Sequence, residues 1–80
     1  MRAYVLVNVT PGKVQDVVRN LVRLRGVKAA DACWGVPDVF VTLEVADEDE
    51  LSKLVLEEIH GLDGVERTQT HIAIPERWFR

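Results

Sequence analysis

A cluster of turn-forming residues, Gly35-Val36-Pro37-Asp38, lies between two apolar runs of the sequence. Gly frees the backbone φ angle, Pro restricts it, and an Asp side chain bonds to nearby backbone amides, so the cluster is typical of the hinge of a β-hairpin. The same hinge would place a carboxylate beside backbone amides, which suits a small polar ligand. Composition alone is compatible with both interpretations, a plain turn and a binding loop.

Cys33, His60 and His71 are the side chains that could form a nucleophile and base set. A lone cysteine is usually inert, and nothing near Cys33 indicates activation. The chain has no glycine-rich phosphate loop, no nucleophile elbow and no histidine pair at metal-ligand spacing. The sequence therefore predicts a protein that is not an enzyme, with no catalytic residues, no metal site and no cofactor.

The acidic run Asp47-Glu48-Asp49-Glu50 has the composition of a metal-binding cluster, but its spacing favours another role. Asp47 with Glu50 three residues later matches a capping box, and acidic side chains in a first helical turn complement the helix dipole. We interpret the run as the start of a helix.

Hydrophobic periodicity divides the chain into six elements. Alternating or β-branched runs predict strands at residues 3–9, 27–34, 39–46 and 65–74. A first amphipathic helix is expected to begin at Thr10 as N-cap with Pro11 as its first residue, and to end at Arg25 before Gly26. A second helix is expected from Asp47 to His60.

The order βαββαβ in 80 residues predicts one α+β domain, residues 1–80, with a ferredoxin-like fold. Its four-stranded antiparallel sheet would carry both helices on one face. The first strand is apolar on both faces, and a core of this size is only marginally stabilising, so a partner subunit is expected to cover the other face. Trp78 and Phe79 in the C-terminal segment are also expected to dock on a neighbouring subunit.

The fourth strand alternates between two kinds of face. Arg67, Gln69 and His71 share one face, and Thr68 and Thr70 share the other with isoleucines that follow them. This pattern is compatible with a binding site, an interface edge or an ordinary solvated edge strand.

Charge and composition limit the partners. The net charge is −3, and the ten Lys and Arg residues are scattered, which does not favour binding to nucleic acid by this chain alone. No stretch approaches the length of a membrane-spanning helix, and a single Cys builds neither a disulfide nor a zinc site. We expect a cytoplasmic protein without membrane or direct DNA contacts.

Two short motifs resemble the effector-binding domain of Lrp/AsnC transcriptional regulators, also called the RAM domain. They are Gly-x-x-Asp at Gly35 and Asp38 and Thr-x-Thr at Thr68 and Thr70, within a likeness that covers about the whole chain. The sequence departs from the family at Trp34, where a small polar residue is common, and at residues 36–37, where Glu-Tyr or a similar pair is frequent. The lost hydroxyls would alter the ligand.

The resemblance implies a homodimeric α+β barrel, in which two sheets pack face to face, and further assembly into rings. It implies that an amino acid or similar small polar ligand binds between dimers, in contact with Gly35, Val36, Asp38, Thr68, Gln69 and Thr70. In this family the domain usually follows a helix-turn-helix, and here the first strand is expected at residue 2 or 3. The resemblance therefore predicts a stand-alone regulatory module of transcription or amino-acid metabolism, able to assemble with a DNA-binding relative.

A second function remains open from the sequence. Small dimeric α+β barrel enzymes, such as cofactor-independent monooxygenases, resemble the same arrangement, and Asn8, Trp34 and His71 would line their pocket. The location of the pocket separates the two functions. It lies between subunits in the regulatory module and inside one subunit in the enzyme.

Overall fold

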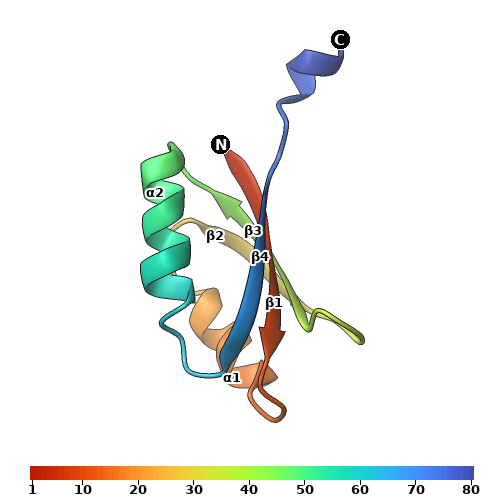
Figure 1. Cartoon of the computed structure of the whole chain (residues 1–80), viewed down its shortest axis with the longest axis vertical. Coiled ribbons are helices and arrows are strands. Elements are labelled where there is room, and N and C mark those ends of the chain that lie inside the picture. The colour runs from red at the N-terminus through yellow and green to blue at the C-terminus, as the bar shows by residue number, and fades with distance from the viewer.

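A computed structural model describes all residues 1–80 of the chain. The elements follow the predicted βαββαβ order (Figure 1). Helix α2 continues directly into a wider π-helical segment, η1, and a short 3-10 helix, η2, follows the last strand. The bounds are β1 Arg2–Val9, α1 Val14–Leu21, β2 Val27–Ala32, β3 Val39–Glu44, α2 Glu48–Lys53, η1 Leu54–Ile59, β4 Val65–Ile72 and η2 Glu76–Phe79.

The strands form one antiparallel sheet in the order β2-β3-β1-β4. In the register, Val5 of β1 lies opposite Val41 of β3 on one side and Thr70 of β4 on the other. Helices α1 and α2 lie on the same face of this sheet (Figure 1). The predicted ferredoxin-like fold is therefore confirmed.

The core lies between this sheet face and the helices. Every buried residue is apolar, which follows from the period-two alternation of the strands and the amphipathic helices. Burying each of the larger aliphatic side chains contributes about 1.5–3 kcal/mol. The core consists of Ala3, Val5, Val7, Val9, Val17, Leu21, Val39, Val41, Leu43, Val45, Leu51, Leu54, Val55 and Ile59.

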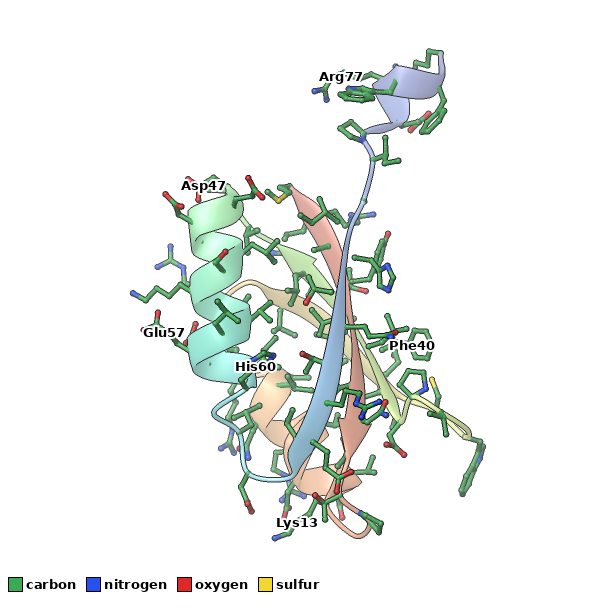
Figure 2. All side chains as sticks on the ribbon, in the orientation of Figure 1. Lys13, Phe40, Asp47, Glu57, His60 and Arg77 are labelled. Carbon is green, nitrogen blue, oxygen red and sulfur yellow. The ribbon has the colours of Figure 1, made fainter.

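The other face of the sheet carries no helix, and we call it the open face. Tyr4 and Phe40 are 40% and 43% exposed there, and Figure 2 shows Phe40 pointing away from the helices. Leu6 lies opposite Phe40 in the register. The apolar second face predicted for the first strand therefore exists, and nothing in a single chain covers it.

The first helix is shorter than predicted at both ends. It begins at Val14, and the Thr10 hydroxyl, instead of capping it, donates to Glu66 Oε2 at 3.1 Å. Gly12 has φ +86°, outside the helical range, and Lys13 N donates to Thr10 O at 3.0 Å to close a turn there. The helix ends at Leu21, and its expected last four residues, 22–25, form turns instead.

Three predicted strands also end two residues early, at Ala32, Glu44 and Ile72. The chain turns into the hairpin after Ala32 and toward the cap of α2 after Glu44. Ile74 precedes Pro75, which has no backbone N–H to continue a ladder. Trp34 therefore does not close β2, and it is fully exposed (104%).

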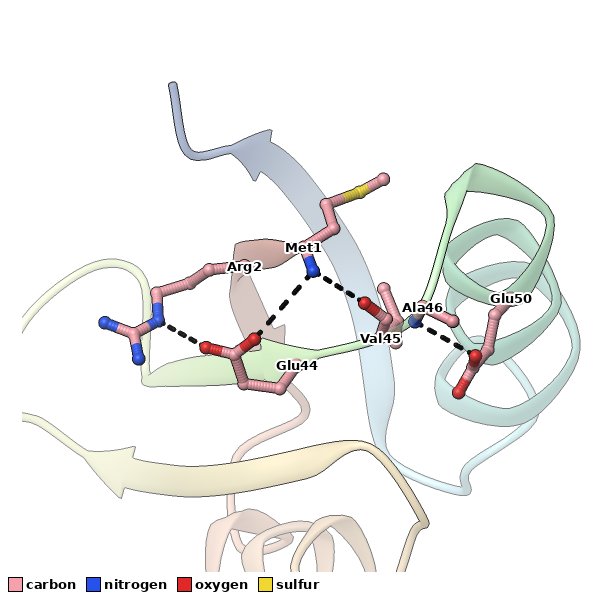
Figure 3. A network of polar contacts seen from close by, with 6 residues as sticks. All are labelled: Met1, Arg2, Glu44, Val45, Ala46 and Glu50. Atoms are coloured by element: carbon pink, nitrogen blue, oxygen red, sulfur yellow. Dashed lines mark hydrogen bonds and ion pairs between the residues drawn. The ribbon is translucent and has the colours of Figure 1, made fainter. Parts of the chain in front are cut away.

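The acidic run forms the predicted helix start. Asp47 Oδ1 accepts a hydrogen bond from Glu50 N at 2.9 Å, as in a capping box. The reciprocal bond is displaced by one residue, since Glu50 Oε2 accepts from Ala46 N at 3.0 Å (Figure 3). Asp47 is thus the N-cap of α2.

Polar contacts fasten the start of β1 to the end of β3 (Figure 3). The Met1 amine donates to Val45 O at 2.7 Å, and Arg2 Nε donates to Glu44 Oε1 at 2.8 Å. The bond to Glu44 is the main cause that raises the pKa of Arg2 above its ordinary value. None of the helices is both long and apolar enough to cross a membrane.

Candidate functional site

Residues 33–38 connect β2 and β3 as a hairpin that extends beyond the sheet (Figure 1). Cys33 N donates to Asp38 O at 2.8 Å and closes it. Gly35 has φ +115°, and no atom lies within 4 Å of the position that a Cβ would take. Val36 is also exposed. The predicted hinge is confirmed, and its tip is free to approach another molecule.

Asp38 anchors the base of this hairpin to β1. Its Oδ2 accepts a hydrogen bond from Val9 N at 2.7 Å, and its own amide donates to Val7 O at 3.0 Å. The side chain is half-buried, and its second oxygen, Oδ1, makes no hydrogen bond within the chain. Asp38 therefore has a structural role, and its Oδ1 has no hydrogen-bond partner within the chain.

The three candidate residues of β4 point to opposite sides of the sheet. Thr68 and Thr70 lie opposite buried valines of β1, on the helix side, whereas Gln69 lies opposite Leu6 on the open face. Thr68 Oγ1 is 2.6 Å from Nε2 of His60, which follows η1. Thr70 is exposed. One small ligand cannot contact all three residues on a single copy.

The surface next to the hairpin has two shallow hollows. The one on the open face has a volume of about 250 Å³ and joins Val36 to Gln69. The other has a volume of about 480 Å³ and joins Gly35 to Asp38. The open-face hollow is lined by Leu6, Asn8, Val36, Pro37, Arg67 and Gln69, and the other by Val14, Ala32, Cys33, Trp34, Gly35 and Asp38.

A third hollow lies at the end of η1, about 370 Å³ in volume, and contains Thr68 beside His60. Thr70 lines none of the three. In the structure, Val36 and Gln69 therefore line one hollow, and Gly35 and Asp38 line another. The six predicted residues do not line one pocket of a single chain.

The candidate catalytic residues are dispersed. Cys33 is exposed on the hairpin, His71 lies opposite Tyr4 on the open face, and His60 lies on the helix side. No group of three His, Cys, Asp or Glu side chains is placed to hold a metal ion. Trp34 and His71 do not line the hollow that contains Asn8, so the enzyme pocket considered from the sequence is not formed within this chain.

Two features of the site were not predicted. Arg67 lines both the open-face hollow and the hollow at the end of η1. Strand alternation places Arg67 on the same face as Gln69, so the sequence pattern could have indicated its place in the open-face hollow. The contact between His60 and Thr68 joins residues on either side of a turn, eight positions apart. No local pattern signals that contact, because it depends on how the turn after η1 leads the chain back into β4.

Comparison with known proteins shows the same domain elsewhere. A sequence profile described as "Lrp/AsnC ligand binding domain" matches residues 2–78. An uncharacterised HTH-type transcriptional regulator of Pyrococcus abyssi is 33% identical over 70 residues, which cover 88% of this chain and 44% of that protein. The chain thus spans less than half the length of this relative.

Solved structures show the same fold. A hypothetical protein from Pyrococcus horikoshii has a TM-score of 0.86 and 29% identity, and the match covers 94% of this chain and 90% of that one. A transcriptional regulator of Neisseria meningitidis, solved as a complex with L-Met, has a TM-score of 0.83 and 18% identity, covering 94% and 50%. With the profile match over nearly every residue, these observations identify the chain as a member of the Lrp/AsnC ligand binding domain family.

Proposed function

We propose that this domain is a regulatory, non-enzymatic module that binds a free amino acid at a junction between two copies of the chain. The match to the Lrp/AsnC ligand binding domain over residues 2–78 carries this proposal. The N. meningitidis neighbour, which was solved with L-Met, supports an amino acid as the class of ligand.

The chemistry at the hairpin fits a zwitterion. Asp38 Oδ1, free of partners within the chain, accepts from the ligand ammonium. Backbone amides near Gly35, in the same hollow as Asp38, donate to the carboxylate. Both charges of an amino acid thus find a complementary group in the hollow that contains Gly35 and Asp38.

The division of the candidate residues supports a site between copies. Thr68 and Thr70 lie on the helix side, so they reach a ligand held at the hairpin only if a second copy presents them. The two copies first pair through their open faces, where Tyr4 and Phe40 lose water on contact. Further copies then form the ring in which hairpin and β4 of different dimers meet.

The regulatory output would come from assembly with a DNA-binding relative. The P. abyssi relative is an HTH-type regulator more than twice as long as the segment matched here. This chain has a net charge of −3 and scattered basic residues, so it is not expected to bind duplex DNA specifically by itself. No arrangement of side chains favours the monooxygenase, since Trp34 lies at the hairpin tip, outside the hollow of Asn8.

Calorimetry with each of the common amino acids tests the proposal, with Asp38→Asn as the variant. The Asn carbonyl still accepts from Val9 N, so the hairpin keeps its anchor while the negative charge is lost. Because hydrogen bonds to charged groups contribute about 1.5–3 kcal/mol, affinity should fall about 10- to 150-fold.

Asp49→Asn, on the exposed first turn of α2, is the matched control and should bind like the wild type. The proposal fails if no amino acid binds, or if Asp38→Asn binds as tightly as the control.

A further inference from the structure

Residues 74–80, which we call the arm, make hydrogen bonds only among themselves. The last backbone bond that joins β4 to β1 is Ala73 N to Arg2 O, at 2.9 Å. Within the arm, Trp78 N donates to Pro75 O at 3.0 Å, and Arg80 Nη2 donates to Glu76 Oε1 at 3.2 Å. The arm extends from the body of the molecule, and Figure 2 shows Arg77 far from the sheet. No hydrogen bond or ion pair therefore joins the arm to the rest of its own chain.

The arm is strongly apolar for a segment in water. Trp78 and Phe79 are 70% and 76% exposed, Ile74 is also exposed, and η2 buries no residue. Aromatic side chains bury large areas when they dock, and they are enriched in the centres of protein interfaces. An arm with this composition is suited to contact another protein surface.

The hairpin is the matching projection at the opposite end of the sheet. Arm and hairpin leave opposite ends of the sheet: the arm continues from β4 along the long axis of the molecule, and the hairpin projects away from the helices (Figure 1). A hollow lined by Tyr4 of the open face and by Ile74 and Arg77 lies at the base of the arm. The hairpin presents Trp34 and Val36, whose side chains contact little else in the chain. The two projections are thus both apolar and both lie beside the face proposed to pair.

We propose that the arm of each copy docks on the hairpin of a second copy, so that two reciprocal arm–hairpin contacts clamp a pair of open faces. The two copies would be related by a twofold axis that lies between the paired faces, parallel to them, and runs across the long axis of the molecule. Rotation about this axis places the arm of one copy at the hairpin of the other. The same operation creates the second contact, as an isologous interface requires. The inference rests on the proposed pairing of open faces.

Charge agrees with this docking. Residues 31–38 carry Asp31 and Asp38 and no basic side chain. The arm carries Arg77 together with Arg80, which pairs with Glu76 of the arm at 3.2 Å. The acidic hairpin and Arg77 of the arm therefore carry opposite charges.

Tryptophan fluorescence tests the contact, because the chain has one tryptophan at each side of it, Trp34 and Trp78. Trp34→Phe leaves the arm reporter alone, and Trp78→Phe leaves the hairpin reporter alone, while both keep an aromatic ring. Each variant is diluted through the range in which sedimentation equilibrium shows the mass change from dimer to monomer. Both emissions should shift to shorter wavelength over the same concentrations at which the dimer forms.

The other outcomes overturn the inference in distinguishable ways. A blue-shifted Trp78 in the monomer means that the arm folds onto its own chain, and red emission in a dimer means that the arm is free. A shift of only one tryptophan means that the arm docks elsewhere. In these three cases face-to-face pairing and amino-acid binding can still hold, whereas a monomer at all concentrations removes the pairing as well.

Alanine variants give a second measurement. Trp78→Ala and Trp34→Ala should each weaken dimerisation at least about tenfold, because each removes both copies of the contact and central aromatics dominate interface energies. Leu56→Ala is the control, an apolar residue of η1 that is 64% exposed away from the arm and hairpin. Equal dissociation constants for all three variants would contradict the inference. Circular dichroism should show the same folded signal in each, since none of these side chains is buried.

Discussion

The helix-covered face of the sheet and its open face are built by alternate residues of the same strands, yet they differ in what surrounds them. Val5 and Val41 face the helices and are almost completely buried, whereas Tyr4 and Phe40, each one position earlier in its strand, remain partly exposed. The covered face is closed by residues of one chain. The open face has no such cover, so it is available for association.

This difference predicts which property a substitution on each face should change. A change on the covered face acts on the free energy of unfolding, because it leaves a cavity in a core that has few other contacts to compensate. A change on the open face acts on association, because its neighbours come from another copy. The predictions below test this separation, and they run from the largest expected effect to the smallest.

Leu43→Ala should have the largest effect. Leu43 is fully buried on the covered face, and such substitutions cost about 2–5 kcal/mol of unfolding free energy. Phe40→Ala, three residues earlier and on the open face, should cost about 1 kcal/mol or less in the monomer but weaken dimerisation. Urea denaturation and sedimentation equilibrium on both variants measure the two effects. Equal losses of unfolding free energy would show that the faces do not differ as proposed.

Asp38→Ala tests a contact outside the core that still contributes to stability. Removing the carboxylate leaves Val9 N without its partner in a half-buried position, which should cost about 1–3 kcal/mol. Asp38→Asn should cost much less, because it keeps an acceptor oxygen. Hydrogen exchange of the Val9 amide, faster in Asp38→Ala than in Asp38→Asn, would confirm the mechanism. Asp31→Ala, an exposed aspartate of β2, serves as the control.

Asp47→Ala should have a smaller effect, because it loosens only the start of the helix that covers the sheet. Loss of an N-cap costs about 0.5–2 kcal/mol, and here the lost bond is the one from Glu50 N. The thermal unfolding midpoint should decrease, with a decrease in helical circular dichroism at moderate temperature. Glu48→Ala, in the same turn but without a capping bond, should change the midpoint less, and the reverse order would count against the assignment.

Much of the fold was predictable because the signals were local. The βαββαβ order followed from periodicity, and the Asp47 cap followed from the spacing of Asp47 and Glu50. The errors occurred at element ends. Thr10 and Pro11 have the composition of a helix start, but the Gly12 conformation and the bond from Thr10 to Glu66 made a turn there instead.

The candidate site was predictable only in part. The hinge nature of residues 35–38 could be recognised because Gly, Pro and Asp favour turns through their own backbone and side-chain chemistry. The combination of Gln69 with Thr68 and Thr70 in one site was incompatible with strand alternation within one copy, as the register confirms. Whether a ligand joins these groups depends on contacts between copies.

The sequence by itself determined which residues avoid water and which begin helices or turns, because these preferences depend on side chains within a few positions of one another. Only the tertiary structure decided that Asp38 accepts from Val9, 29 positions away, and that His60 contacts Thr68. Such contacts require the sheet register and the path of the turn between η1 and β4. Strand pairing brings distant positions together at hydrogen-bonding distance, and no local property of either partner specifies that distance.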